Sequence, residues 1–73
     1  MNFLMNLLKK LKLKSIEINK NEEEIYGDYR NNSFCIFVLE NNNYKLVING
    51  KNFDNQNKEN VVDLLNSMKH GEI

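Results

Sequence analysis

The chain has 73 residues and a single cysteine, Cys35, so it is too short for a second domain and cannot form a disulfide within itself. Its 10 basic and 10 acidic side chains cancel, which excludes the basic surplus typical of dedicated nucleic-acid binders and the acidic surplus of a nucleic-acid mimic. We therefore expect one small globular domain, residues 1–73, whose free energy of unfolding is only roughly 3–5 kcal/mol.

The first predicted element is a helix over residues 3–13. Four leucines recur at i, i+3, i+4 and i+7 from Leu4, which places them on one helical face. Lysines follow near the C-terminal end, where positive charge suits the helix dipole. We expect the leucine stripe to belong to the core, because a domain of this size needs the helix to cover its sheet. No apolar stretch approaches the roughly 18 residues of a membrane span.

Four segments are predicted to be strands: residues 15–19, 23–30, 34–39 and 44–48. The first alternates apolar and polar residues, as is typical of a half-buried strand. Gly27 in the second indicates a bulge or a close backbone contact. The third is apolar throughout, so we predict that it is the central strand, buried on both faces or nearly so.

Asparagines mark the turns between the later strands. Residues 41–43 are all asparagine, and Asn49-Gly50 is a strong hairpin signal because both residue types tolerate positive φ. We expect residues 51–53 to return briefly along the preceding strand.

The last predicted element is a helix whose apolar residues share one face: Val61, Leu64, Leu65 and Met68. Asn55 or Asn57 is the expected N-cap, and Gly71 is the expected residue after the C-terminus. The predicted fold is therefore α+β and two-layer: an N-terminal helix, a four-stranded antiparallel meander and a C-terminal helix, with both helices on the same face of the sheet.

Residues that could perform catalysis are sparse. The three glycines are isolated, so no phosphate-binding loop is present. His70 is the only histidine, which leaves no serine triad and no zinc-type ligand cluster. Cys35 lies in an apolar run and is interpreted as a small buried hydrophobic residue. We expect no enzymatic activity, no cofactor and no metal.

The candidate partner-binding residues come from one segment that is acidic and contains two tyrosines: Glu22, Glu23, Glu24, Tyr26, Asp28 and Tyr29. Tyrosine is enriched at interface hot spots, and carboxylates beside it would steer a basic surface of a partner protein. The alternative is an ordinary solvated strand whose tyrosines bridge core and surface.

A second candidate function is nucleic-acid binding through the lysines of the first twenty residues: Lys9, Lys10, Lys12, Lys14 and Lys20. They would contact phosphate, although Arg30, the only arginine, limits bidentate readout of bases. A third is a peripheral membrane helix, which is disfavoured because the lysines follow the apolar part instead of lining its opposite face.

We interpret the chain as a small non-catalytic protein-binding module. We expect it in the cytoplasm, because basic residues follow its apolar start, whereas they precede that of a signal peptide. Abundant asparagine and lysine indicate a low-GC genome. Small size and local charge segregation favour a phage or mobile-element inhibitor that occludes a host enzyme or defence complex. A further hypothesis is a homodimer in which two copies pair their sheet edges near residues 44–53.

Overall fold

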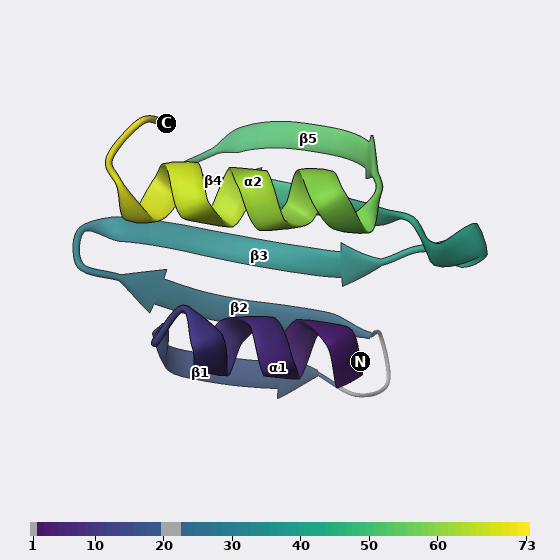
Figure 1. Ribbon diagram of the computed structural model, residues 1–73, viewed down its shortest axis with the longest axis horizontal. Coiled ribbons are helices and arrows are strands. Elements are labelled where there is room, and N and C mark those ends of the chain that lie inside the picture. The colour runs from purple at the N-terminus through teal and green to yellow at the C-terminus, as the bar shows by residue number, and fades with distance from the viewer. Residues whose placement is uncertain (1, 20–22) are drawn as a thin grey trace.

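The structure is a computed structural model that describes residues 2–19 and 23–73 (for residues 2, 14–16 and 19, the backbone alone). Its elements in chain order are α1 (Asn2–Lys10), β1 (Lys14–Asn19), β2 (Glu24–Tyr29), β3 (Asn32–Val38), a short 3-10 turn (Glu40–Asn42), β4 (Tyr44–Ile48), β5 (Lys51–Gln56) and α2 (Lys58–Lys69). Neighbouring strands all pair antiparallel, in the order β1-β2-β3-β4-β5. The two helices lie side by side over one face of this sheet (Figure 1). The α+β two-layer prediction is confirmed, with five strands in the sheet.

The fifth strand is longer than the brief return over residues 51–53 that the sequence predicted. Asn49 and Gly50 both have positive φ, 51° and 83°, and form the expected two-residue turn. The strand after them runs antiparallel along the whole of β4, from Lys51 opposite Ile48 to Gln56 opposite Tyr44. Hydrophobic alternation did not reveal β5, because its side chains are polar apart from one phenylalanine. β5 is therefore a polar edge strand, and β4, part of the edge expected for dimer pairing, lies inside the sheet.

The core is a single apolar layer between the sheet and the two helices. Its fully buried side chains are Leu4, Leu8, Ile25, Ile36, Leu46, Ile48, Val61, Leu65 and Met68. They come from both helices and from the three inner strands. The leucine stripe of α1 is therefore core, as predicted.

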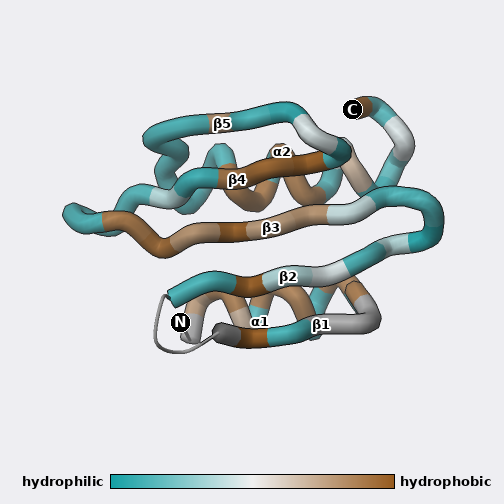
Figure 2. The backbone as a smooth tube through the Cα atoms, turned by 180° about the vertical axis from the view of Figure 1, so that it is seen from behind, coloured by the Kyte–Doolittle hydropathy of each residue, from teal (hydrophilic) through white to brown (hydrophobic). Residues whose placement is uncertain are grey.

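β3 is central but it is not buried on both faces. Phe34 and Ile36 point into the core, whereas Cys35 and Phe37 are only half-buried on the other face. The prediction was wrong at this point because both helices lie on the same side of the sheet. Figure 2 shows the sheet from the uncovered side, with the helices behind it.

Two contacts join the helices across the gap between them. At their N-terminal ends, Lys58 Nζ lies 5.3 Å from the centre of the Phe3 ring. At their C-terminal ends, Lys69 Nζ donates a hydrogen bond of 2.9 Å to the backbone oxygen of Leu11. A lysine of α2 thus binds the end of α1, which makes the two helices one layer.

Both helices end with a residue at positive φ. Gly71 (φ 72°) takes this place after α2, as predicted. After α1 the same place is held by Lys12 (φ 56°), so the helix ends earlier than the predicted residue 13. The hydrogen bonds from Lys12 N to Lys9 O and from Leu13 N to Leu8 O are those of a Schellman motif. Asn57 is the N-cap of α2, and its Oδ1 accepts a hydrogen bond of 2.9 Å from Asn60 N.

Candidate functional site

The sheet face without helices is the candidate site, and we call it the open face. Its side chains alternate with those of the core along each strand, and those described include Glu17, Glu24, Tyr26, Asp28, Ser33, Cys35, Phe37, Lys45, Val47, Asn49 and Asn52. A shallow hollow of about 620 Å³ extends over this face from Tyr26 and Cys35 to the turn at Asn49 and Gly50. The open face therefore gathers residues that are spread over more than thirty positions of the chain.

Tyr26 is at the centre of the acidic part of the open face. It is 40% exposed, among the highest values for a large hydrophobic side chain in the described chain. Glu17 lies directly opposite on β1, and Glu24 and Asp28 are two residues away on either side along β2. The Tyr26 hydroxyl donates a hydrogen bond to the Glu24 carboxylate, which fixes the ring over its own strand. Three carboxylates thus surround one exposed aromatic ring.

Apolar side chains adjoin Tyr26 on the side of β3. Cys35 is its cross-strand neighbour, and Val47 follows Cys35 in the same row. In the next row Phe37 lies beside Lys45, whose Nζ is 5.6 Å from the ring centre. The open face is therefore acidic towards β1 and β2 and more apolar towards β3 and β4.

Cys35 is half-buried in this surface. Burial raises the pKa of its thiol from 9.0 to about 11, the Glu24 carboxylate adds to the rise, and Lys45 opposes it. A thiol with this pKa is neutral at physiological pH, so Cys35 lacks the thiolate that a nucleophile needs.

One end of the open face is fixed by asparagine side chains. Asn49 Oδ1 accepts from Ser33 N at 3.0 Å, and Asn49 Nδ2 donates to Asn32 Oδ1 at 2.7 Å. These bonds tie the turn after β4 to the start of β3. The hollow therefore has a rigid rim at this end.

The structure brings together half of the predicted partner-binding residues. Glu24, Tyr26 and Asp28 share the open face. Tyr29 is on the other face, where it packs against the core. It lies three positions after Tyr26, and side chains an odd number of positions apart along a strand point to opposite faces of the sheet. Glu23 is exposed in the turn before β2, and Glu22 lies outside the described residues.

Sequence reasoning did not select Glu17, Phe37 or Lys45 for the site. A signal for Glu17 was present, because the predicted strand over residues 15–19 has isoleucines on one face and Glu17 on the other. Phe37 was assigned to the core because the prediction treated its strand as buried on both faces. No pattern in the sequence pointed to Lys45 as a site residue.

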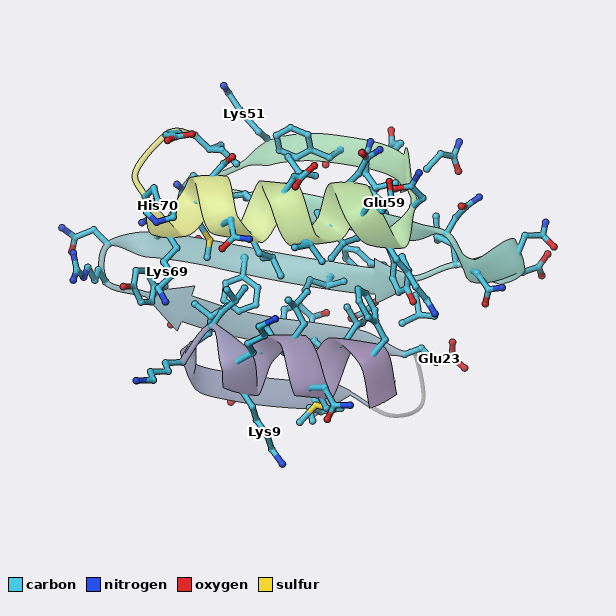
Figure 3. The ribbon with its side chains drawn as sticks, in the orientation of Figure 1. Lys9, Glu23, Lys51, Glu59, Lys69 and His70 are labelled. Carbon is cyan, nitrogen blue, oxygen red and sulfur yellow. The ribbon has the colours of Figure 1, made fainter. Side chains whose placement is uncertain are left out.

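Three of the five lysines of the alternative site lie in the helix layer, and Lys14 begins β1 opposite Asp28. Lys9 and Lys10 are exposed on α1, and Lys12 is exposed at its cap. Figure 3 shows Lys9 pointing away from α2. The side chain of Lys14 and the whole of Lys20 lie outside what the structure describes, so the predicted patch is seen only in part.

Among residues 2–19 and 23–73, no group of three or more His, Cys, Asp or Glu side chains is placed to hold a metal ion. Within the same residues, no helix has both the length and the apolar character needed to cross a membrane. No protein-family model matches the chain, and neither does any curated protein or solved structure.

Proposed function

We propose that the protein is a small binding module that engages a basic surface of another protein through its open face. The observation that carries this proposal is the exposed ring of Tyr26 among the carboxylates of Glu17, Glu24 and Asp28. Aromatic side chains at the centre of an interface supply much of its binding energy. Carboxylates around them steer a cationic partner and reject anionic ones.

The apolar part of the open face supports the same proposal. Phe37 and Val47 extend the contact area beyond Tyr26, so that an interface there would have an apolar centre and a charged rim. Within the described part of the open face Lys45 is the single cation. The partner surface would therefore combine lysines and arginines opposite β1 and β2 with an apolar patch opposite β3 and β4.

A different protein suits this face better than a second copy of the chain. Two open faces brought together would place carboxylates opposite carboxylates, and like charges across an interface are destabilising. A basic groove that normally holds nucleic acid offers the complementary sign. We therefore propose, as the finer form, an inhibitor of phage or mobile-element origin that occludes such a groove on a host enzyme or defence complex.

The test is capture by tagged protein from a low-GC bacterial lysate, with and without nuclease treatment. We compare wild type with Glu24→Lys/Asp28→Lys on the open face and with the matched control Asp63→Lys/Glu72→Lys, which makes the same change in net charge at exposed positions elsewhere. We expect one stoichiometric protein that wild type and control retain and the open-face variant loses. Equal retention by both variants, or recovery that vanishes with nuclease, would overturn the proposal.

A further inference from the structure

The end of the molecule where both helices finish is rich in cations. Figure 3 shows Lys69 and His70 at this end and the carboxylates of Glu23 and Glu59 towards the other. The hydrogen bond from Lys69 to Leu11 brings the end of α1 to the same place. The C-terminal lysine and histidine of α2 and the end of α1 therefore meet at this end of the molecule.

A hollow of about 460 Å³ lies at this end, between the β2–β3 turn and the C-terminus of α2. Its lining is Tyr29, Arg30, Asn32, Lys69, His70 and Gly71. The lining contains the chain's only arginine, its only histidine and a lysine, and it includes no carboxylate. We call this hollow the cationic pocket.

Tyr29 holds the cations of the pocket in place. Its ring packs against the core, so its position is set by the fold. Arg30 Cζ lies 5.4 Å and Lys69 Nζ lies 5.9 Å from the ring centre, within the range of cation–π attraction. One fixed ring therefore contacts both cations, and both line the same hollow.

Lys69 and Arg30 have further hydrogen-bond donors that an anion can accept from. The Lys69 ammonium has three N–H groups, of which Leu11 O takes one. The Arg30 guanidinium has five N–H groups in a planar fork that suits phosphate.

The backbone of Arg30 has a conformation that suits glycine. Its φ is 56°, a conformation that costs a side-chain-bearing residue roughly 1–2 kcal/mol and that glycine adopts freely. Arginine is therefore a poor choice for the turn itself. Its side chain supplies the charge that lines the pocket.

We infer that the cationic pocket binds a phosphate dianion, either free or as the end of a small phosphate monoester. The Lys69 ammonium and the Arg30 guanidinium offer the N–H donors that phosphate oxygens accept. The inference does not rest on the proposed partner binding, because the pocket shares no residue with the open face.

The test is a two-dimensional amide NMR titration at constant ionic strength, with inorganic phosphate and O-phosphoserine replacing chloride. We expect saturable shifts confined to residues 29–32 and 69–71. Preference for phosphoserine would identify a monoester as the ligand, and preference for inorganic phosphate the free ion. Shifts no larger than those with chloride would overturn the inference.

Arg30→Gly is the decisive variant, because glycine fits the turn and the fold is retained. It should weaken phosphate binding roughly tenfold. Lys58→Met is the matched control, since Lys58 also lies over an aromatic ring but at the other end of the helices, and it should bind like wild type. Unchanged binding by Arg30→Gly, or an equal loss in Lys58→Met, would contradict the inference. A parallel titration uses single-stranded DNA. If DNA binds more strongly than either phosphate ligand, with shifts that spread to Lys9 and Lys10, the ligand is nucleic acid and the inference is contradicted.

Discussion

The ring of Phe34 lies directly over Gly27 on the core side of the sheet. The two residues are cross-strand partners, and a methyl group added at Gly27 would meet ring carbons of Phe34 at 2.5 and 2.9 Å. Phe34 is only 3% exposed, so its ring has little room to move. The glycine lets the ring fill the space between β2 and the helices, and the close contact predicted from the sequence is confirmed.

Gly27→Ala should therefore be destabilising. We expect a loss of about 1–3 kcal/mol, the usual cost of overpacking a core, which is a large part of the stability of a domain this small. Urea unfolding followed by circular dichroism measures it. Gly27→Ala combined with Phe34→Leu should cost less than the sum of the two single changes, and strict additivity would contradict the account.

The residues at positive φ after the two helices provide opposite predictions. Lys12→Gly should stabilise the protein by about 0.5–1 kcal/mol, because it removes the strain of a side chain at positive φ. Gly71→Ala should destabilise it by about 1 kcal/mol for the same reason. Thermal unfolding of both variants checks the pair, and two changes of the same sign would be inconsistent with these helix ends.

The pKa of Cys35 predicts a pH dependence. Because the folded value of about 11 lies above the ordinary 9.0, the fold favours the neutral thiol. Its stabilising contribution is present below about pH 9 and is lost as the pH rises towards 11. Alkylation by iodoacetamide should therefore have a midpoint near pH 11 in the folded protein and lower in urea. Glu24→Gln should lower the folded midpoint, and a wild-type midpoint at or below 9 would contradict the assignment.

Among the elements, those with apolar periodicity could be predicted and those without could not. The leucines of α1 and the stripe of α2 are set by burial, so their helical faces follow from spacing alone. β5 has only Phe53 in the core cluster, and it is held by backbone pairing to β4. Backbone pairing leaves no pattern in side-chain hydropathy, and the strand could be inferred only from its hairpin turn.

The contact between the helices gives a prediction at this scale. Lys69→Met removes the hydrogen bond to Leu11 O while keeping the apolar stem, and it should cost about 1 kcal/mol. Lys9→Met, which alters an exposed lysine of α1, should cost less than about 0.5 kcal/mol. Chemical unfolding of the two variants distinguishes them, and equal losses would argue against the contact.

At the scale of the whole molecule, the site depends on which sheet face the helices leave open. The sequence predicted both helices on one face and named Glu24, Tyr26 and Asp28, but it also named Tyr29, which lies on the covered face. The register of β2 against β1 and β3 decides which residues gather around Tyr26. That register comes from long-range pairing, and a propensity for local structure does not determine it.

Charge at this scale also shapes recognition. The open face is acidic and the cationic pocket is at one end, while the net charge is zero. A partner would therefore be oriented by the local fields of the molecule, since the net charge gives no long-range attraction. The contact is therefore located by residue, and a crosslinking experiment measures that location directly.

The most direct test of the central claim replaces Tyr26 with the photo-crosslinker p-benzoylphenylalanine, and Asp63 on α2 with the same group as a control. Both proteins are irradiated in nuclease-treated low-GC bacterial lysate, and crosslinked peptides are identified by mass spectrometry. The account predicts one abundant protein crosslinked at position 26 and not at position 63, through a peptide rich in lysine and arginine. Equal crosslinking at both positions, or a peptide without basic surplus, would contradict it.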